Sequence, residues 1–166
     1  MNRTEGNNAE LQMKEAQRAI IQGYSQKLPM MIVKAVAEEF GEKGWAIMQK
    51  AAEQFGRERA HILQEALSID VNDARSLGKI FDFEDSLGGV KGEWVESSPA
   101  RAKKNETKCG ARHVYKDYPL FCERILYWIA RSTISELNPD MEIEDFCHGK
   151  LMARGDEMCE VVVKRK

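Results

Sequence analysis

The spacing of the apolar residues changes near residue 90, and this change limits the chain to folds that combine helices with a sheet. Before it, apolar residues recur every three or four positions, as in Met13, Ala16 and Ile20, which is typical of one helix face. In the 141–153 segment they alternate with polar residues, which is typical of a strand with one buried side. The pattern predicts an α+β fold in which a helical N-terminal half packs with a short antiparallel sheet.

A few residues mark where the predicted helices begin and end. Pro29 suits the first turn of a helix, because the N–H group that proline lacks has no partner there. Gly41 interrupts the next apolar stripe, so we expect one helix to end near it and a longer helix to follow. Asn72 or Asp73 can cap a further helix with a side-chain oxygen, and Gly88-Gly89 can stop it. Helices therefore account for most of the N-terminal half.

The C-terminal half is predicted to hold one buried helix and several short strands. Residues 120–136 are apolar nearly all round, which indicates a helix that is covered on most sides. Short strands are expected over residues 93–96 and 105–109, with a polar loop over 97–104. The second half therefore supplies the sheet and one helix that packs against it.

A hairpin is predicted at the C-terminus, with residues 154–156 as its turn. To place the apolar residues of both strands on one face, we pair Leu151 with Cys159 and Cys147 with Val163, because a slip of one residue turns every side chain over. In this register Cys147 and Cys159 are separated along the ladder by roughly 13 Å, at ~3.3 Å per residue. We therefore expect these two cysteines not to share one ion.

Length, charge and hydropathy narrow the class of protein. The 166 residues fit one domain, and we expect an N-terminal helix or arm over 1–28 and a single α+β domain over 29–166. A net charge of -2 and a pI of about 6.0 argue against a nucleic-acid partner, and no apolar run is long enough for a membrane helix. The polar N-terminus resembles no signal peptide, so we expect a cytoplasmic protein with its cysteines free or ligating.

The densest group of reactive side chains lies between Cys109 and His113. Lys108 and Arg112 are neighbouring cations that would favour a thiolate at Cys109, and His113 can exchange a proton near neutral pH. The alternative is a half-buried cysteine beside a surface arginine and histidine. Trp94 is a candidate for stacking against a substrate. The alternative is a half-buried tryptophan that packs on the face of a strand.

Metal binding is a second interpretation of the cysteines. No C-x-x-C pair occurs, so the usual spacing of a structural zinc site is absent. Cys109 and Cys159 can still converge if their strands are adjacent, together with Cys122 from the buried helix, which otherwise suits core packing. Zinc or iron is the candidate ion, and no cofactor is required by the sequence.

Three parts of the sequence resemble one family. They are the helical stretches 37–46 and 55–59, the pair Lys108-Cys109, and the segments 137–140 (Leu-Asn-Pro-Asp) and 153–159 (Ala-Arg-Gly-Asp-Glu-Met-Cys). Over residues 30 to 163 the chain resembles the L-2-amino-thiazoline-4-carboxylic acid hydrolase family, which is distantly similar to the 4-vinyl-reductase-type small-molecule-binding domains. The resemblance implies an α+β hydrolase that opens a cyclic amidine to a carbamoyl-cysteine.

The resemblance also implies site residues, since Cys109 and Cys159 match the two cysteines of the family. In the predicted hydrolase, Cys109 attacks the amidine carbon, or ligates as a thiolate, and His113 transfers the proton. Arg112 binds the substrate carboxylate through a charge-assisted fork, and Asp156, in the turn before the second cysteine, receives the cationic amidine.

Two further hypotheses stay open beside the hydrolase. Gly110 stands where the family often has proline, and Ala130 stands where it often has an acidic residue. The missing acid at position 130 favours a non-catalytic sensor or carrier that binds a small molecule or a metal ion with the same cysteines. The last hypothesis is an interaction module without a site, and the apolar N-terminal helices leave a homodimer open as a partner.

Overall fold

The computed structural model describes residues 12–17, 19–21 and 23–166. The first two of these ranges are helical, and a π-helical turn, η1 (Gly23–Lys27), follows them. The long helix α2 (Leu28–Leu67) begins there, with a proline in its first turn as predicted. The rest of the predicted arm lies outside the described residues.

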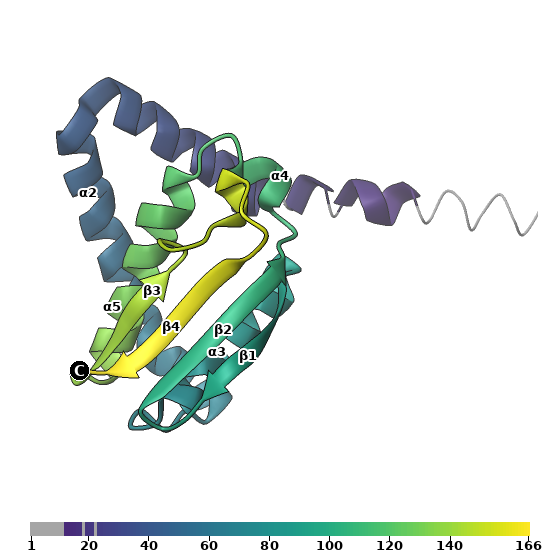
Figure 1. The fold of residues 1–166 in the computed structure, drawn as a ribbon. Helices are drawn as coiled ribbons and strands as arrows, with labels where there is room; N and C mark the ends of the chain where they lie inside the picture. The colour runs from purple at the N-terminus through teal and green to yellow at the C-terminus, as the bar shows by residue number, and fades with distance from the viewer. Residues whose placement is uncertain (1–11, 18, 22) are drawn as a thin grey trace, which may run out of the picture.

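Helix α2 bends sharply at Gly41, and the bend is visible in Figure 1. The backbone of Gly41 has φ 52° and ψ -133°, a conformation that glycine adopts readily because it has no Cβ. The sequence predicted that one helix ends near Gly41 and a longer helix follows, and the structure agrees, because α2 consists of two helical segments joined at the non-helical backbone of Gly41.

The next helix, α3 (Ala74–Gly88), is capped by Asp73, whose carboxylate accepts the N–H of Arg75 at 2.9 Å. It ends at Gly89 in the left-handed conformation, with φ 64°. Both boundaries agree with the sequence prediction, because a cap and a glycine stop are local signals.

Four antiparallel strands form one sheet in the order β1-β2-β4-β3 (Figure 1). The α+β fold class is therefore confirmed. The strands are β1 (Lys91–Ser97), β2 (Arg101–Lys108), β3 (Met141–Phe146) and β4 (Cys159–Arg165). Strand β2 starts earlier than predicted, because Ser98 closes a tight hairpin by donating its N–H and hydroxyl to the carbonyl of Arg101.

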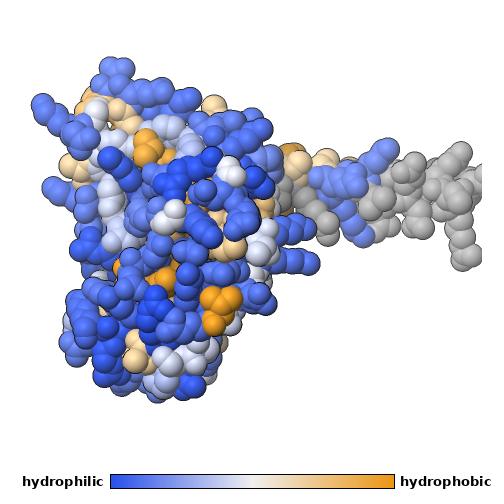
Figure 2. Space-filling view, viewed as in Figure 1, coloured by the Kyte–Doolittle hydropathy of each residue, from blue (hydrophilic) through white to orange (hydrophobic). Residues whose placement is uncertain are grey.

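The two faces of the sheet differ in polarity. Ion pairs link the strands across the outer face: Lys103 of β2 contacts Glu160 of β4 at 3.1 Å, and Glu144 of β3 binds both Arg101 of β2 at 2.8 Å and Lys164 of β4 at 2.9 Å. Figure 2 views the molecule from the same side as Figure 1 and shows a mostly hydrophilic surface. The apolar face is therefore directed at the helices.

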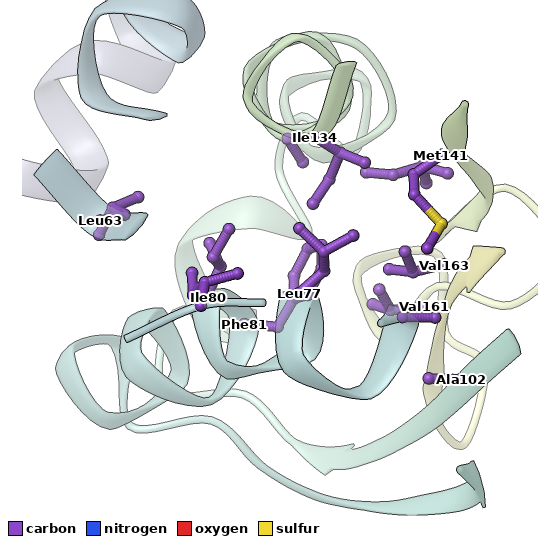
Figure 3. Close-up of a cluster of buried hydrophobic side chains, with 13 residues drawn as sticks. Leu63, Leu77, Ile80, Phe81, Ala102, Ile134, Met141, Val161 and Val163 are labelled. Carbon is purple, nitrogen blue, oxygen red and sulfur yellow. The ribbon is translucent and has the colours of Figure 1, made fainter. Parts of the chain in front are cut away.

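The inner face of the sheet forms a closed core with α3 and the helix α5 (Tyr127–Leu137). In Figure 3, side chains from these helices and from β2, β3 and β4 point toward one another. Leu77, Val161 and Val163 are fully buried there, with 0% of each exposed. This core fixes the position of β4, whose other end reaches the candidate site.

Helix α5 and the π-helical turn before it, η2 (Phe121–Leu126), form the predicted buried helix. α5 packs closely on α2 at Gly56, where a Cβ atom would collide with the Ser132 hydroxyl and the Ile129 carbonyl. A π-helical turn inside a helix is frequent at functional sites, and η2 contributes directly to the cavity described below.

The predicted register of the C-terminal hairpin is wrong. Phe146 pairs with Val161, and the N–H of Cys147 donates to the carbonyl of Glu160 at 2.8 Å. The strand ends there because Cys147 takes a positive φ of 60°, and the Asp145 carboxylate accepts the next backbone N–H groups. Residues 147–158 are therefore a long connection that contains the short helix η3 (Met152–Arg154).

Candidate functional site

A cavity of about 340 Å³ lies at the end of the sheet opposite the C-terminus of β4. Helices α2, α3 and α5, the turn η2, strand β3 and the 147–158 connection all contribute apolar side chains to its wall. Among them are Phe55, Phe81, Leu126, Ile129, Phe146 and Leu151. The volume lies in the range of small-molecule sites, which are mostly apolar with a few placed polar groups.

All four cysteines lie on the wall of this cavity. Cys109 follows β2, Cys122 lies in η2, Cys147 follows β3 and Cys159 begins β4. The sequence analysis expected Cys109 and Cys159 to converge, with Cys122 as a third member. It separated Cys147 from Cys159, and the structure corrects this because the true register brings residues 147 and 160 together.

Cys159 is the cysteine whose surroundings favour a thiolate. The N–H of Met152 donates to its sulfur at 3.3 Å, and the Cys147 thiol donates to it as well. These hydrogen bonds and the nearby Arg112 lower the pKa of Cys159 below its usual value against the effect of burial, whereas the pKa of Cys147 is raised. A thiolate is the nucleophilic and metal-binding form of cysteine.

Cys109 differs from Cys159 and from the prediction that it is a thiolate. Burial raises its pKa, and the backbone N–H of Ala111 offsets only part of the effect. Burial also raises the pKa of Cys122. The sequence predicted a thiolate at Cys109 from the adjacent cations, but the structure favours the neutral thiol there, because desolvation exceeds the effect of exposed charges.

The structure places the other predicted site residues in two groups. Arg112 is exposed and lies at the cavity with the cysteines. His113 is also exposed but does not line the cavity. Asp156 lies outside it and accepts the N–H of Leu151 at 2.8 Å. Trp94 does not line the cavity; it packs over Gly78 and donates its indole N–H to Asp82 at 3.1 Å.

Within the described ranges, no three histidine, cysteine, aspartate or glutamate side chains converge closely enough to hold a metal ion. The cysteines line a hollow rather than surround a point, so their arrangement does not fit a closed tetrahedral site for zinc or iron.

The sequence did not reveal three acidic residues of the cavity wall, of which Glu106 is buried and Glu84 and Asp85 are half-buried. Glu84 forms an ion pair with Arg59, and Asp85 forms one with Lys104. Glu106 on β2 is only 8% exposed, and its pKa is raised to about 8, chiefly by burial. The mostly polar sequence of β2 concealed the burial of Glu106, although residues 102, 104 and 106 alternate as the inner face of a strand does.

The described part of the chain contains no helix with the length and hydropathy needed to cross a membrane.

Comparisons with known proteins indicate the fold alone. No protein-family model and no curated protein matches the sequence. A similar solved structure is a trafficking protein particle complex subunit 3 from Naegleria fowleri, covalently bound to palmitic acid. It superposes with a TM-score of 0.55 at 12% sequence identity, and the match covers 84% of this chain and 94% of that chain. The resemblance to the thiazoline hydrolase family stays a prediction.

Proposed function

We propose that this chain is a small-molecule-binding domain, of the sensor or carrier type, that encloses one mostly apolar molecule in the cysteine-lined cavity. The observation that carries the proposal is the cavity itself, with a volume of about 340 Å³ and a wall made largely of aromatic and aliphatic side chains. Protein interiors are normally close-packed, so a hollow of this size inside a small domain favours a ligand.

The chemistry of the wall supports an apolar occupant. Neutral cysteines behave as small hydrophobic side chains, and moving apolar ligand surface out of water contributes about 25 cal/mol per Å². The similar structure from Naegleria fowleri is covalently bound to palmitic acid, which supports the proposal because a protein of similar fold carries an apolar chain.

The test is a titration with 1-aminoanthracene, an apolar dye that is neutral at pH 7. We expect saturable binding with one site per chain, and a loss of at least ten-fold in affinity in Ala153→Phe and Ala111→Phe, whose new rings would fill the cavity. Ala46→Phe is the matched control, because Ala46 is exposed on α2. Equal binding by all four proteins, or no saturable binding, would contradict the proposal.

A hydrolase acting on a small cyclic amidine is the second candidate function, and the thiolate environment of Cys159 favours it. Its sulfur lies in the same cavity as Cys109 and Arg112, which supports a site where a cysteine would act as nucleophile and Arg112 would bind the substrate carboxylate. We expect Cys159→Ser and Cys109→Ala to abolish turnover of 2-amino-thiazoline-4-carboxylate if this function holds. Turnover that is absent in the wild type, or unchanged in both variants, would refute it.

A homodimer is the partner arrangement we propose to test. Ile20, Tyr24, Met31 and Ile32 are exposed apolar side chains in the helical segments before the bend of α2. Sedimentation equilibrium should give twice the mass of one chain, and a monomer at micromolar concentration would contradict this arrangement.

A further inference from the structure

Glu106 is a buried acid to which the described residues offer no hydrogen bond or ion pair. On the inner face of the sheet, Glu106 of β2 lies opposite Cys159 of β4, and Lys104 of β2 lies opposite Val161. Glu106 and Cys159 therefore share the inner face at the cavity end. The carboxyl group lines the cavity and, within the part of the chain that the structure describes, accepts no hydrogen bond and forms no ion pair. Buried polar groups normally have a hydrogen-bond partner. A ligand in the cavity could supply the partner that the Glu106 carboxyl group lacks.

The charges around Glu106 are mainly negative. Asp85 and Glu84 of α3 and Cys159 of β4 all raise its pKa, and only Lys104 opposes them. Lys104 is itself bound by Asp82 and Asp85. In a poorly solvated site this field favours a proton or another cation over an electron-rich oxygen.

Further titratable groups face the same space from other elements. They are Cys109 after β2, Tyr115 at the end of α4 (Arg112–Tyr115), Cys122 in η2, Cys147 after β3, and Arg59 and Arg112. The three cysteines and Tyr115 have raised pKa values and are neutral at pH 7. Arg59 is paired with Glu84, and Arg112 lies exposed at the wall. None of these groups neutralises Glu106.

We infer that the ligand of this cavity is an apolar amine, with its protonated nitrogen bound by the Glu106 carboxylate and its hydrocarbon part against the aromatic wall. The inference rests on the proposed binding function and names the class of ligand. Apolar ammonium ions suit such a site, because aromatic faces attract cations and the acid supplies the counter-charge.

A second unpartnered group agrees with this ligand class. The Oε1 atom of Gln26 is buried without a hydrogen-bond partner among the described residues, and Gln26 lines the cavity. Like a carboxylate, an amide oxygen accepts hydrogen bonds. A ligand that donates hydrogen bonds, as an ammonium group does, could satisfy this amide oxygen as well.

Proton balance gives the inference a direct signature. Below about pH 8 Glu106 carries a proton in the empty cavity. An ammonium ion enters with its own proton, so the Glu106 proton leaves for the solvent and the pair forms without other chemistry. Binding should therefore release close to one proton at pH 7, and affinity should rise with pH up to about 8.

The experiment compares octylamine, octanol and octanoate, which share one chain length, by calorimetric titration of the full chain. For the wild type we expect octylamine to bind at least ten-fold more tightly than octanol, with proton release measured in buffers of different ionisation enthalpy. In Glu106→Gln we expect the affinity for octylamine to fall at least ten-fold and that for octanol to be unchanged. Glu93→Gln, at an exposed position of β1, should behave as the wild type.

The other possible results of this titration would contradict either the amine inference or the proposed binding function. Octanol or octanoate binding as tightly as octylamine, or octylamine binding without proton release, would overturn the amine inference and leave the apolar cavity in place. A preference for octanoate would point to Arg112 as the charged contact. No binding of any of the three would overturn the proposed function as well. The proton measurement needs only the wild type, so it decides even if Glu106→Gln does not fold.

Discussion

The two ends of the sheet are packed in different ways although the same strands run through both. At one end, Val163 faces Ala102 across β4 and β2, and both residues are fully buried in the closed core. At the other end, Cys159 faces Glu106 at the wall of a cavity. The end at Val163 therefore supplies stability through dense packing, while the end at Cys159 leaves space and polar groups for a ligand.

The charged residues of the inner face show the same contrast. Lys104 lies one step toward the closed core, and its ammonium group is bound by two aspartates of α3. Glu106 lies one step toward the cavity and has no such partner among the described side chains. A satisfied buried pair maintains the fold, whereas an unpaired buried acid costs stability and is frequent at functional sites.

The largest effect should come from matched truncations at the two ends. We expect Leu77→Ala, in the closed core, to lower the free energy of unfolding by about 4 kcal/mol, within the range for buried leucines. Leu151→Ala, on the cavity wall, should cost about 2 kcal/mol, because Leu151 has fewer partner atoms on the cavity side. Urea unfolding of both variants measures the difference, and equal losses would mean that the two ends are packed alike.

The next effect is a pH dependence that belongs to the cavity end. The pKa of Glu106 is about 8 in the folded chain and about 4.3 when unfolded, so the folded state binds more protons between these values. Stability should therefore fall as pH rises from about 5 to 8, by roughly 1 kcal/mol per pH unit.

Glu106→Gln removes this titration, so its free energy of unfolding should exceed that of the wild type at pH 8 and converge with it near pH 4. Urea midpoints across this pH interval provide the measurement. Parallel profiles for the two proteins would show that Glu106 titrates normally.

The smallest effect separates the cysteines of the cavity end by their reactivity. We expect N-ethylmaleimide to label Cys159 at pH 7 about ten-fold faster than Cys122, because only Cys159 has a lowered pKa and the thiolate is the reactive form. Peptide mass spectrometry after timed quenching gives both rates. Faster labelling of Cys122 would reverse the assignment of the thiolate.

Local signals explain what the sequence could predict. The Asp73 cap, the glycine stop after α3 and the proline of α2 act within a few residues, and all three appear in the structure. The alternation of apolar and polar residues is also a local signal, and it predicted strands and hence the α+β class. These features depend on neighbours in the chain.

The cavity depends on contacts that periodicity does not contain. The hairpin register failed because Cys147 leaves the strand with a positive φ, which alternation alone does not reveal. The burial of Lys104 and Glu106 was missed because charged residues usually lie outside, and the carboxylates that bind Lys104 come from a helix about twenty residues earlier. The sequence therefore named three of the four cysteines of the site but missed its acids.

Protection of Cys159 by a bound ligand tests the central claim most directly, since its sulfur lies on the cavity wall. The measurement is the rate of N-ethylmaleimide labelling of Cys159 with and without saturating 1-aminoanthracene. We expect the dye to slow labelling at least ten-fold. Saturable dye binding with an unchanged labelling rate would mean that the ligand binds outside the cavity.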